Sequence, residues 1–211
     1  LLRVSHLSQH SIGENLQDEI FGALEKQIND IDIIIFSDFN YGSLPQILVD
    51  RITYIAKQKN IFLAADSQSS SQTGDISRFR GMDLITPTER EARLSLRDNE
   101  SGLATLATKI LQESLATNLL LKLGEDGLMV HSTSSSKFLA ANDKIAALNP
   151  MAVDVAGAGD SLLISSALSL CAGATIWEAG CIGSIAAAIQ VSRVGNSPIQ
   201  IDEIIDQLNH F

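Results

Sequence analysis

Residues 154–160 of the chain read Asp-Val-Ala-Gly-Ala-Gly-Asp, and a helix-length run of apolar and small residues follows at once. Small side chains let a backbone approach a ligand closely, and the free N–H groups at a helix start attract anions with the help of the helix dipole. Asp160, in the first helical turn, can accept a proton from an attacking hydroxyl. The amides of Gly157, Ala158 and Gly159 can hold phosphoryl oxygens. The stretch therefore predicts an anion hole with a general base beside it.

The same turn also has a purely structural interpretation. The segment from Gly157 to Gly159 can be a tight turn, and Asp160 can be a carboxylate that the helix dipole stabilises. A Gly-x-Gly-Asp pattern alone favours this interpretation, because such short motifs recur without function. The rest of the sequence is needed to choose between the anion-hole interpretation and the structural one.

Upstream of this turn, apolar runs of strand length alternate with segments of helical period. This alternation predicts βαβ units and a mostly parallel sheet within an α/β fold. The predicted strands are Asp32 to Phe36, Ile61 to Ala65, Asp83 to Thr86 and Leu119 to Leu123, and the predicted helices are Leu44 to Lys57 and Leu103 to Leu115.

After Lys122 the pattern changes to short strands and then to small-residue helices. Leu128 to His131 and Ile145 to Leu148 predict a hairpin-like extension of the sheet around a polar Ser132 to Lys137 turn. Two helices nearly free of charge are expected to be buried, and an amphipathic helix N-capped by Asp202 closes the chain. Their expected ranges are Ser161 to Ala172, Ile176 to Ser192 and Asp202 to Leu208.

Composition narrows the possible functions. The chain has 211 residues, of which 45% are hydrophobic, enough for one compact domain with its own core. The formal net charge of -10 argues against a nucleic-acid groove or an anionic membrane surface as partner. Cys171 and Cys181 lie in no CxxC pair and are expected to pack as small apolar groups rather than form a disulfide or a zinc site.

The ends of the chain also carry expectations. We find no signal-peptide pattern and no membrane-length apolar stretch, which predicts a soluble cytoplasmic protein. The segment from Leu1 to Val4 has no initiator Met and reads as the middle of a strand, so we expect the native polypeptide to begin earlier.

Polar and glycine residues follow the predicted strands. Ser37 and Asp38 follow the first strand, Asp66 the second, Thr86 to Glu91 the third, and Gly124 the fourth. Because ligands bind at the carboxyl ends of parallel strands, these residues are expected to share one edge of the sheet.

The seven-residue turn resembles the DTxGAGD motif of ribokinase-like (PfkB) sugar kinases, and differs from it at Val155 and Ala156. The resemblance covers essentially residues 1–211, which correspond to roughly the C-terminal two thirds of a family member, without the N-terminal sugar-binding strand and lid. It implies a three-layer α/β fold with a mostly parallel central sheet and helices on both faces. It also implies phosphoryl transfer from Mg-ATP to a sugar hydroxyl, with Asp160 as base.

Other family motifs occur in the family's order and imply further site residues. Glu91 matches the carboxylate of the TPNxxE segment that organises the water shell of magnesium, with Thr88 at the Asn position; its alternative is a solvated helix-face carboxylate. Asp154 matches a carboxylate of the family's monovalent-cation site, for which the resemblance implies K⁺, and its alternative is a cap before the turn. The nucleotide-binding positions implied by the resemblance are Lys122, Gly124, Gly127, Ser184 and Gly195, of which Lys122 alone could be a strand-end charge.

Within the family, the segments around Asp38 and Arg78 most resemble the heptose-7-phosphate kinases of ADP-heptose synthesis. This implies a sugar or sugar phosphate as substrate, with Asp38 as a substrate residue, and allows a homodimer and a fused or adjacent nucleotidyltransferase domain. Two cations of those kinases are replaced here by Tyr41 and by the Ser67-Gln68 pair. Together with Thr88 and Ser184, Tyr41 motivates the alternative of a degenerate, non-catalytic nucleotide-binding or assembly module. A protein that binds another small anion is the third alternative.

Overall fold

The fold is known from a computed structural model that describes residues 10–68, 74–133, 142–149 and 151–210. One six-stranded sheet has the order β1-β2-β3-β4-β5-β6. Strands β1 to β4 are parallel, and β4-β5 and β5-β6 are antiparallel. The strands are β1 (Ile33–Asp38), β2 (Phe62–Ser67), β3 (Leu84–Ile85), β4 (Asn118–Lys122), β5 (Leu128–Ser132) and β6 (Asn142–Ile145).

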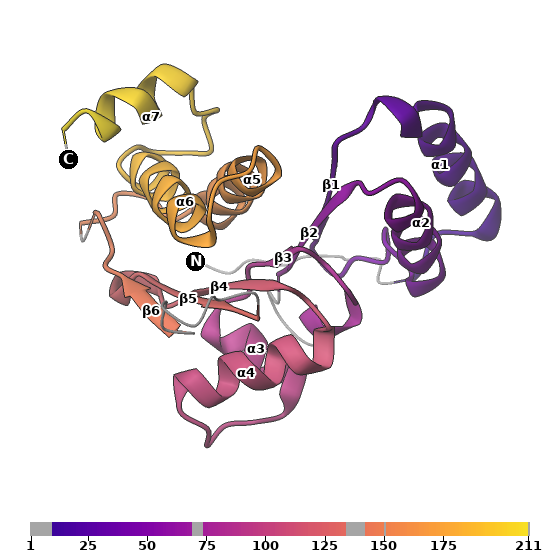
Figure 1. Ribbon diagram of the computed structural model, residues 1–211, viewed down its shortest axis with the longest axis horizontal. Helices are drawn as coiled ribbons and strands as arrows, with labels where there is room; N and C mark the ends of the chain where they lie inside the picture. The colour runs from indigo at the N-terminus through magenta and orange to yellow at the C-terminus, as the bar shows by residue number, and fades with distance from the viewer. Residues whose placement is uncertain (1–9, 69–73, 134–141, 150, 211) are drawn as a thin grey trace, which may run out of the picture.

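Helices cover both faces of this sheet (Figure 1). They are α1 (Glu14–Gln27), α2 (Gln46–Gln58), α3 (Glu89–Leu96), α4 (Leu103–Ser114), α5 (Ala158–Cys171), α6 (Ile176–Val191) and α7 (Ile201–Leu208). Short 3₁₀ turns are η1 (Ile28–Asp30), η2 (Ile76–Arg78) and η3 (Gly124–Asp126). Helices α3 and α4 lie below the sheet and α5 and α6 above it in Figure 1, while α7 packs outside α6. The layers are those of the predicted three-layer fold.

Alternating side chains of the central strands supply two separate cores. In β4, Leu119 and Leu121 join the cluster with α2 and α4, whereas Leu120 joins the cluster with α5 and α6. Successive strand residues point to opposite faces, so each strand serves both layers. This is why the central strands read as unbroken apolar runs in the sequence.

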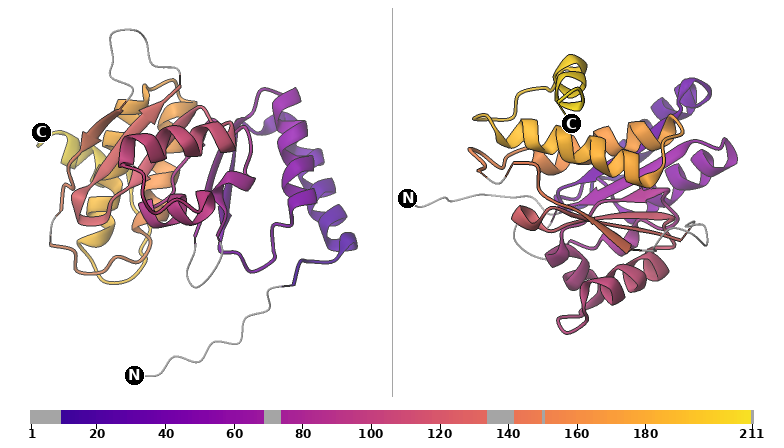
Figure 2. Two further views of the ribbon diagram at one scale, coloured as in Figure 1. Left: turned by 90° about the horizontal axis from the view of Figure 1, so that it is seen from below. Right: turned by 60° about the vertical axis from the view of Figure 1, so that its left-hand side comes forward.

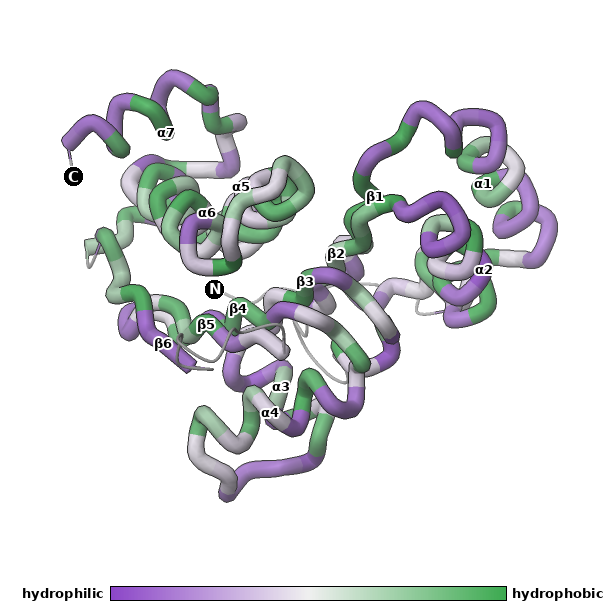
Figure 3. The backbone as a smooth tube through the Cα atoms, viewed as in Figure 1, coloured by the Kyte–Doolittle hydropathy of each residue, from purple (hydrophilic) through white to green (hydrophobic). Residues whose placement is uncertain are grey.

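Helices α5 and α6 lie side by side across the sheet (Figure 2) and are packed closely. A Cβ at Gly183 would lie 2.1 Å from Ser166 Oγ, so only glycine permits this approach. Both helices are mostly pale and green in Figure 3, in keeping with their low charge, whereas α7 alternates between hydrophilic and hydrophobic residues. Close packing of these two helices, which carry one acidic residue each, fixes where α5 begins and therefore where the turn at residues 154–160 lies.

Several predictions about the elements need correction. The N-cap of α7 is Gln200, not Asp202, because Gln200 and Glu203 form the capping box. The strand expected at Ile145 to Leu148 is β6, which begins and ends three residues earlier. Its position is set by pairing with β5, in which Ile145 lies opposite Leu128. Helices α1 and α3 were not predicted at all.

Burial also differs from expectation. Ile164 and Leu168 on α5 are 48% and 52% exposed, so α5 is buried only on the side that faces the sheet and α6. Cys171 is partly buried but Cys181 is exposed, so only the first packs as expected. The predicted strand at Leu1 to Val4 lies outside the described residues, as does most of the Ser132 to Lys137 turn. Within the part of the chain that the structure describes, we find no helix with the length and apolar character needed to span a membrane.

Candidate active site

The carboxyl ends of the parallel strands bring the predicted site residues to one edge of the sheet. Asp38 ends β1 opposite Ser67 of β2, and Lys122 ends β4 in a parallel bridge with Thr88. Side chains from segments far apart in the sequence therefore meet where ligands bind in such sheets.

The turn that opens α5 has the geometry that the sequence predicts. Gly157 has a left-handed backbone (φ 78°), and a Cβ there would lie 2.4 Å from the Asn196 side chain. Helix α5 begins at Ala158, so Asp160 lies in its first turn. The Ala158 N–H donates to the Val155 carbonyl at 3.3 Å, a long bond, while the first N–H groups of a helix have no acceptor within it. The turn thus presents donors beside a carboxylate.

Asp160 is half-buried and is held by a residue that the sequence analysis did not assign to the site. Gln68, just after β2, donates from Nε2 to Asp160 Oδ1 at 3.2 Å. The bond fixes one carboxylate oxygen of Asp160. In the sequence, Gln68 stands out by its place after a strand end and as part of the Ser67-Gln68 pair that replaces a cation of the heptose kinases.

Lys122 forms a buried ion pair with Asp66, the last but one residue of β2. Lys122 Nζ lies 2.8 Å from Asp66 Oδ2, with the two side chains 14% and 0% exposed. A Cβ at Gly159 would lie 3.3 Å from Lys122 Nζ, so the amine reaches the catalytic turn. Asp66 was predicted only as a strand-end residue, and the structure makes it the partner of the predicted phosphate-binding lysine.

The electrostatics of Asp66 are unusual. Burial raises its pKa; the charge and hydrogen bond of Lys122 oppose that rise, and the nearby Glu91 and Asp160 charges add to it. Its second oxygen, Oδ1, is buried and has no hydrogen-bond partner. A buried carboxylate oxygen of this kind is a natural ligand for a proton, a water or a hard cation.

Glu91 is buried and belongs to the capping box of α3, so it is not the solvated helix-face carboxylate of the alternative interpretation. Its Oε2 accepts the Thr88 N–H at 2.7 Å, and Thr88 Oγ1 accepts the Glu91 N–H at 3.2 Å. Thr88, where the related kinases have Asn, is therefore the N-cap of a complete capping box. The carboxylate still lies close enough to Asp66 to raise its pKa.

Asp154 ties the catalytic turn to the loop after α6. Its oxygens accept the N–H groups of Ala156 and Gly195, both at 3.0 Å, and these bonds lower its pKa. Gln190 Nε2 reinforces the link by donating to the carbonyls of Ala156 (3.1 Å) and Gly195 (2.9 Å). A carboxylate and two backbone carbonyls thus gather beside the turn, which is the type of donor set that a monovalent cation would use.

The remaining predicted nucleotide residues are distributed around the β4-β5 turn and α6. Lys122 and Gly124 line a groove of about 550 Å³ against α3, together with Arg90. Gly127 (φ 92°) is required by the fold itself, since a Cβ there would lie 2.1 Å from the Ile145 carbonyl oxygen. Ser184 is buried in α6, and Gly195, in the loop after this helix, has a left-handed backbone (φ 79°).

Asp38 is not free to bind a ligand through both oxygens. It is buried, and its Oδ2 accepts from Arg78 Nη2 at 2.7 Å while its Oδ1 accepts the Asn40 N–H at 2.9 Å. Besides its predicted role as a substrate residue, Asp38 therefore has a structural role, because it holds the loop after β1.

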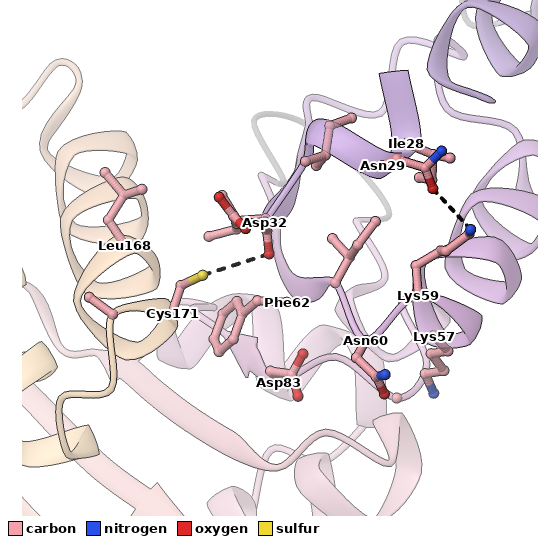
Figure 4. Close-up of a pocket in the computed structure, with 15 residues that line it drawn as sticks. Ile28, Asn29, Asp32, Lys57, Lys59, Asn60, Phe62, Asp83, Leu168 and Cys171 are labelled. Carbon is pink, nitrogen blue, oxygen red and sulfur yellow. Dashed lines mark hydrogen bonds between the residues drawn. The ribbon is translucent and has the colours of Figure 1, made fainter. Parts of the chain in front are cut away.

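A larger hollow of about 1000 Å³ lies at the opposite edge of the sheet (Figure 4). Asp32, Phe62 and Asp83, at the amino ends of β1 to β3, line it, and Cys171 Sγ donates to the Asp32 carbonyl there at 3.6 Å. None of the residues that the sequence assigns to the site lines this hollow, so its size does not make it the active site.

Comparison with known proteins accounts for this arrangement. The sequence profile described as pfkB family carbohydrate kinase matches residues 9–202. The chain belongs to this family. The predicted family and the predicted fold class are thereby confirmed.

Curated relatives of this pfkB chain include the bifunctional protein HldE of Desulfatibacillum aliphaticivorans, 30% identical over 212 residues that cover 99% of this chain and 41% of the relative. HldE of Shewanella piezotolerans is 32% identical over 184 residues, 85% of this chain and 36% of the relative. The chain spans about two fifths of the length of these proteins.

Solved structures agree on the fold of the pfkB chain. Ribokinase of Thermotoga maritima superposes with a TM-score of 0.69 at 23% identity, over 95% of this chain and 62% of the ribokinase. Phosphofructokinase-2 of Escherichia coli, in complex with potassium, gives a TM-score of 0.75 at 17% identity, over 95% and 63%.

Proposed function

We propose that the chain is the nucleotide-binding and catalytic part of an ATP-dependent kinase that phosphorylates a hydroxyl of a sugar or sugar phosphate. The observation that carries the proposal is the meeting, at one sheet edge, of Asp160 at the start of α5 with the buried Lys122–Asp66 pair. Family membership supports the reaction class, and the geometry of the site supports the roles proposed for its residues.

Asp160 acts as the general base. Its Oδ1 is occupied by the Gln68 amide, and its second oxygen can accept a proton. In the transfer, the acceptor oxygen bonds to the γ-phosphorus, the bond from that phosphorus to the bridging oxygen of ADP breaks, and the hydroxyl proton passes to Asp160. The base lies at the helix start where negative charge on the phosphoryl group is best stabilised.

The catalytic turn and Lys122 stabilise that charge. The amides of Gly157 and Gly159 act as the anion hole, with Ala158 joining them when its long bond to Val155 opens. Lys122, which Asp66 holds beside Gly159, can meet a phosphate oxygen. Because these donors are fixed before the reaction, little reorganisation accompanies the transfer.

The carboxylates of this edge fit a magnesium ion. Asp66 Oδ1 is buried without a partner and Glu91 lies nearby, and Mg²⁺ prefers oxygen ligands and retains several waters. When bound, the ion would neutralise phosphate charge. Asp154, with the carbonyls that surround it, would hold a K⁺-like monovalent cation beside the turn.

The nucleotide is proposed to extend from the turn along the groove at Lys122 and Gly124, with the adenine near Ser184 and Gly195. Gly127 contributes by shaping the β4-β5 turn. We propose that sugar phosphorylation requires the polypeptide in its native length, since the chain covers only 62% of the ribokinase it matches. A homodimer and a second, nucleotidyltransferase domain are part of the same proposal, and the description of HldE as bifunctional supports the second domain.

The second candidate is a non-catalytic nucleotide-binding or assembly module of the same fold. The capping role of Thr88 and the presence of Tyr41 where related kinases carry Lys favour it. The Asp160 carboxylate and the Lys122–Asp66 pair argue for the kinase, because a site without a reaction has no need of a base.

Calorimetry with Mg-ATP and Mg-ADP at millimolar concentration tests the nucleotide site. We expect heat from both and a rise in melting temperature, since a ligand at 100 times its dissociation constant adds about 2.7 kcal/mol of stability. The absence of both effects would contradict the proposal. Nucleotide binding with no phosphoryl transfer by the native-length protein, across neutral sugars and sugar phosphates, would favour the non-catalytic module.

A further inference from the structure

The loop after β1 presents two aromatic side chains at the edge of the site. Phe39 and Tyr41 are 43% and 36% exposed, and their rings are stacked with centroids 6.3 Å apart and an angle of 19° between the planes. Asn40 between them has a left-handed backbone (φ 58°), which turns both rings to the same side of the loop. Paired aromatic surface of this kind offers a flat apolar face with a polar rim to a ligand.

Hydrogen bonds from one arginine hold both ends of this loop. Arg78 donates from Nη2 to Asp38 Oδ2 at 2.7 Å and to the Leu44 carbonyl at 3.0 Å, at the two ends of the loop. Its guanidinium lies 4.2 Å from the centre of the Phe79 ring, which is fully buried. The aromatic pair therefore lies on a fixed support and needs little ordering when a ligand binds.

Three hydrogen bonds connect the loop, through the end of β2, to the Asp160 carboxylate. Asn40 Nδ2 donates to the Gln68 carbonyl at 2.9 Å and to Ser67 Oγ at 3.2 Å. Gln68 in turn donates from its side chain to Asp160 Oδ1 at 3.2 Å. Gln68 thus bonds both to Asn40, the residue between the two rings, and to Asp160, so it links the aromatic loop to the proposed base.

The charges at this edge disfavour an anionic acceptor. Two cations at this edge are held by carboxylates, Lys122 by Asp66 at 2.8 Å and Arg78 by Asp38 at 2.7 Å. Asp160 and Glu91 add negative charge. A phosphate already present on the acceptor sugar would lie near these carboxylates and the Gln68 amide. Repulsion between like charges in such a site lowers affinity.

We propose that Phe39, Tyr41 and Gln68 form the acceptor platform of the kinase and select an unphosphorylated sugar. The C–H face of the sugar packs on the two rings, and the Gln68 amide and Asp160 contact its hydroxyls. The inference rests on the proposed function. It narrows the proposed acceptor from a sugar or sugar phosphate to an unphosphorylated sugar.

The test is ligand binding to the native-length protein in the presence of Mg-ADP, measured by saturation-transfer NMR and calorimetry. The probes are D-fructose, D-mannose and D-sedoheptulose, each compared with its terminal phosphate. We expect at least one neutral sugar to bind about tenfold more tightly than its phosphate. Tighter binding of the phosphates, or no binding of any neutral sugar, would overturn the proposal.

Single-residue variants test which side chains bind the sugar. Phe39→Ala is expected to weaken neutral-sugar binding about tenfold and Phe39→Tyr to preserve it. The control Tyr54→Ala removes a 70% exposed ring on α2 and should change nothing. Tyr41→Lys combined with Gln68→Lys should reverse the preference towards the phosphates. If Phe39→Ala leaves the affinity for the neutral sugar unchanged, the platform is refuted.

The same samples separate this inference from the proposed function. Mg-ADP is titrated alone into each variant. Nucleotide binding without any Phe39-dependent sugar binding would refute the platform only. Sugar binding that depends on Phe39, with no nucleotide binding, would refute the kinase proposal and leave the platform as a sugar site.

Discussion

Lys122→Met tests whether the buried ion pair has the role that the structure gives it. The substitution keeps an unbranched side chain but leaves Asp66, which is fully buried, without its partner at 2.8 Å. At that distance and an effective dielectric constant of about 20, the gross attraction between the two charges is about 6 kcal/mol. Removing one partner of a buried pair typically costs about 3–5 kcal/mol in the free energy of unfolding.

The cost should depend on pH, and its sign follows from the pKa of Asp66. Burial raises that pKa above 3.8, and the loss of Lys122 removes what opposes the rise. The folded state then binds more protons than the unfolded state, so stability falls as pH increases from about 4 towards the folded pKa, by up to about 1.4 kcal/mol per pH unit. The penalty should therefore be smallest near pH 4 and grow as the pH rises towards the folded pKa.

Urea unfolding followed by circular dichroism and Trp177 fluorescence, at pH 5 and pH 7, measures this penalty. The control is the double variant Lys122→Met with Asp66→Asn, which has no buried charge and should recover most of the stability and lose the pH dependence. If Lys122→Met alone matches the wild type within about 1 kcal/mol at both pH values, the buried pair as described is wrong.

In the native-length protein, Asp160→Asn should lower turnover about a hundred- to ten-thousand-fold while calorimetric nucleotide affinity changes little; turnover within a few-fold of the wild type would leave Asp160 only its helix-end role. Gly157→Ala should destabilise the fold by more than Gly173→Ala, because both backbones are left-handed (φ 78° and 96°) but only the first Cβ meets a neighbour, the Asn196 side chain at 2.4 Å. Equal losses in thermal unfolding would contradict that packing. The pKa of Asp154 is lowered below 3.8 by two backbone N–H groups, so its stabilisation is present above about pH 4 and is lost as pH falls. Acid titration of Asp154→Asn should show a shallower loss of stability, and a curve identical to the wild type would count against the link.

The sequence alone determined the fold class, the family and the position of the turn that opens α5. Buried parallel strands read as apolar runs because both faces are covered, so their order along the chain could be predicted. The turn at residues 154–160 is local, since small residues, a helix start and a carboxylate within seven positions specify one geometry. Local features of this kind need no knowledge of the rest of the chain.

Helix and strand ends were less predictable. Helix α3 is held by a capping box between Thr88 and Glu91, which resembled a metal-binding motif rather than a helix signal in the sequence. The edge strand β6 is largely polar, and only its pairing with β5 defines it. Such elements depend on neighbours that periodicity does not reveal.

The tertiary structure alone decided which side chains meet. Asp66 and Lys122 are 56 residues apart, and Gln68 and Asp160 are 92 apart, yet both pairs are in contact. Asp38 is predicted to contact substrate, and the fold also pairs it with Arg78, which the sequence did not reveal. A single sequence specifies the chemistry of each residue, but the distance between two of them depends on how parallel strands align their carboxyl ends, which is a property of the packed sheet.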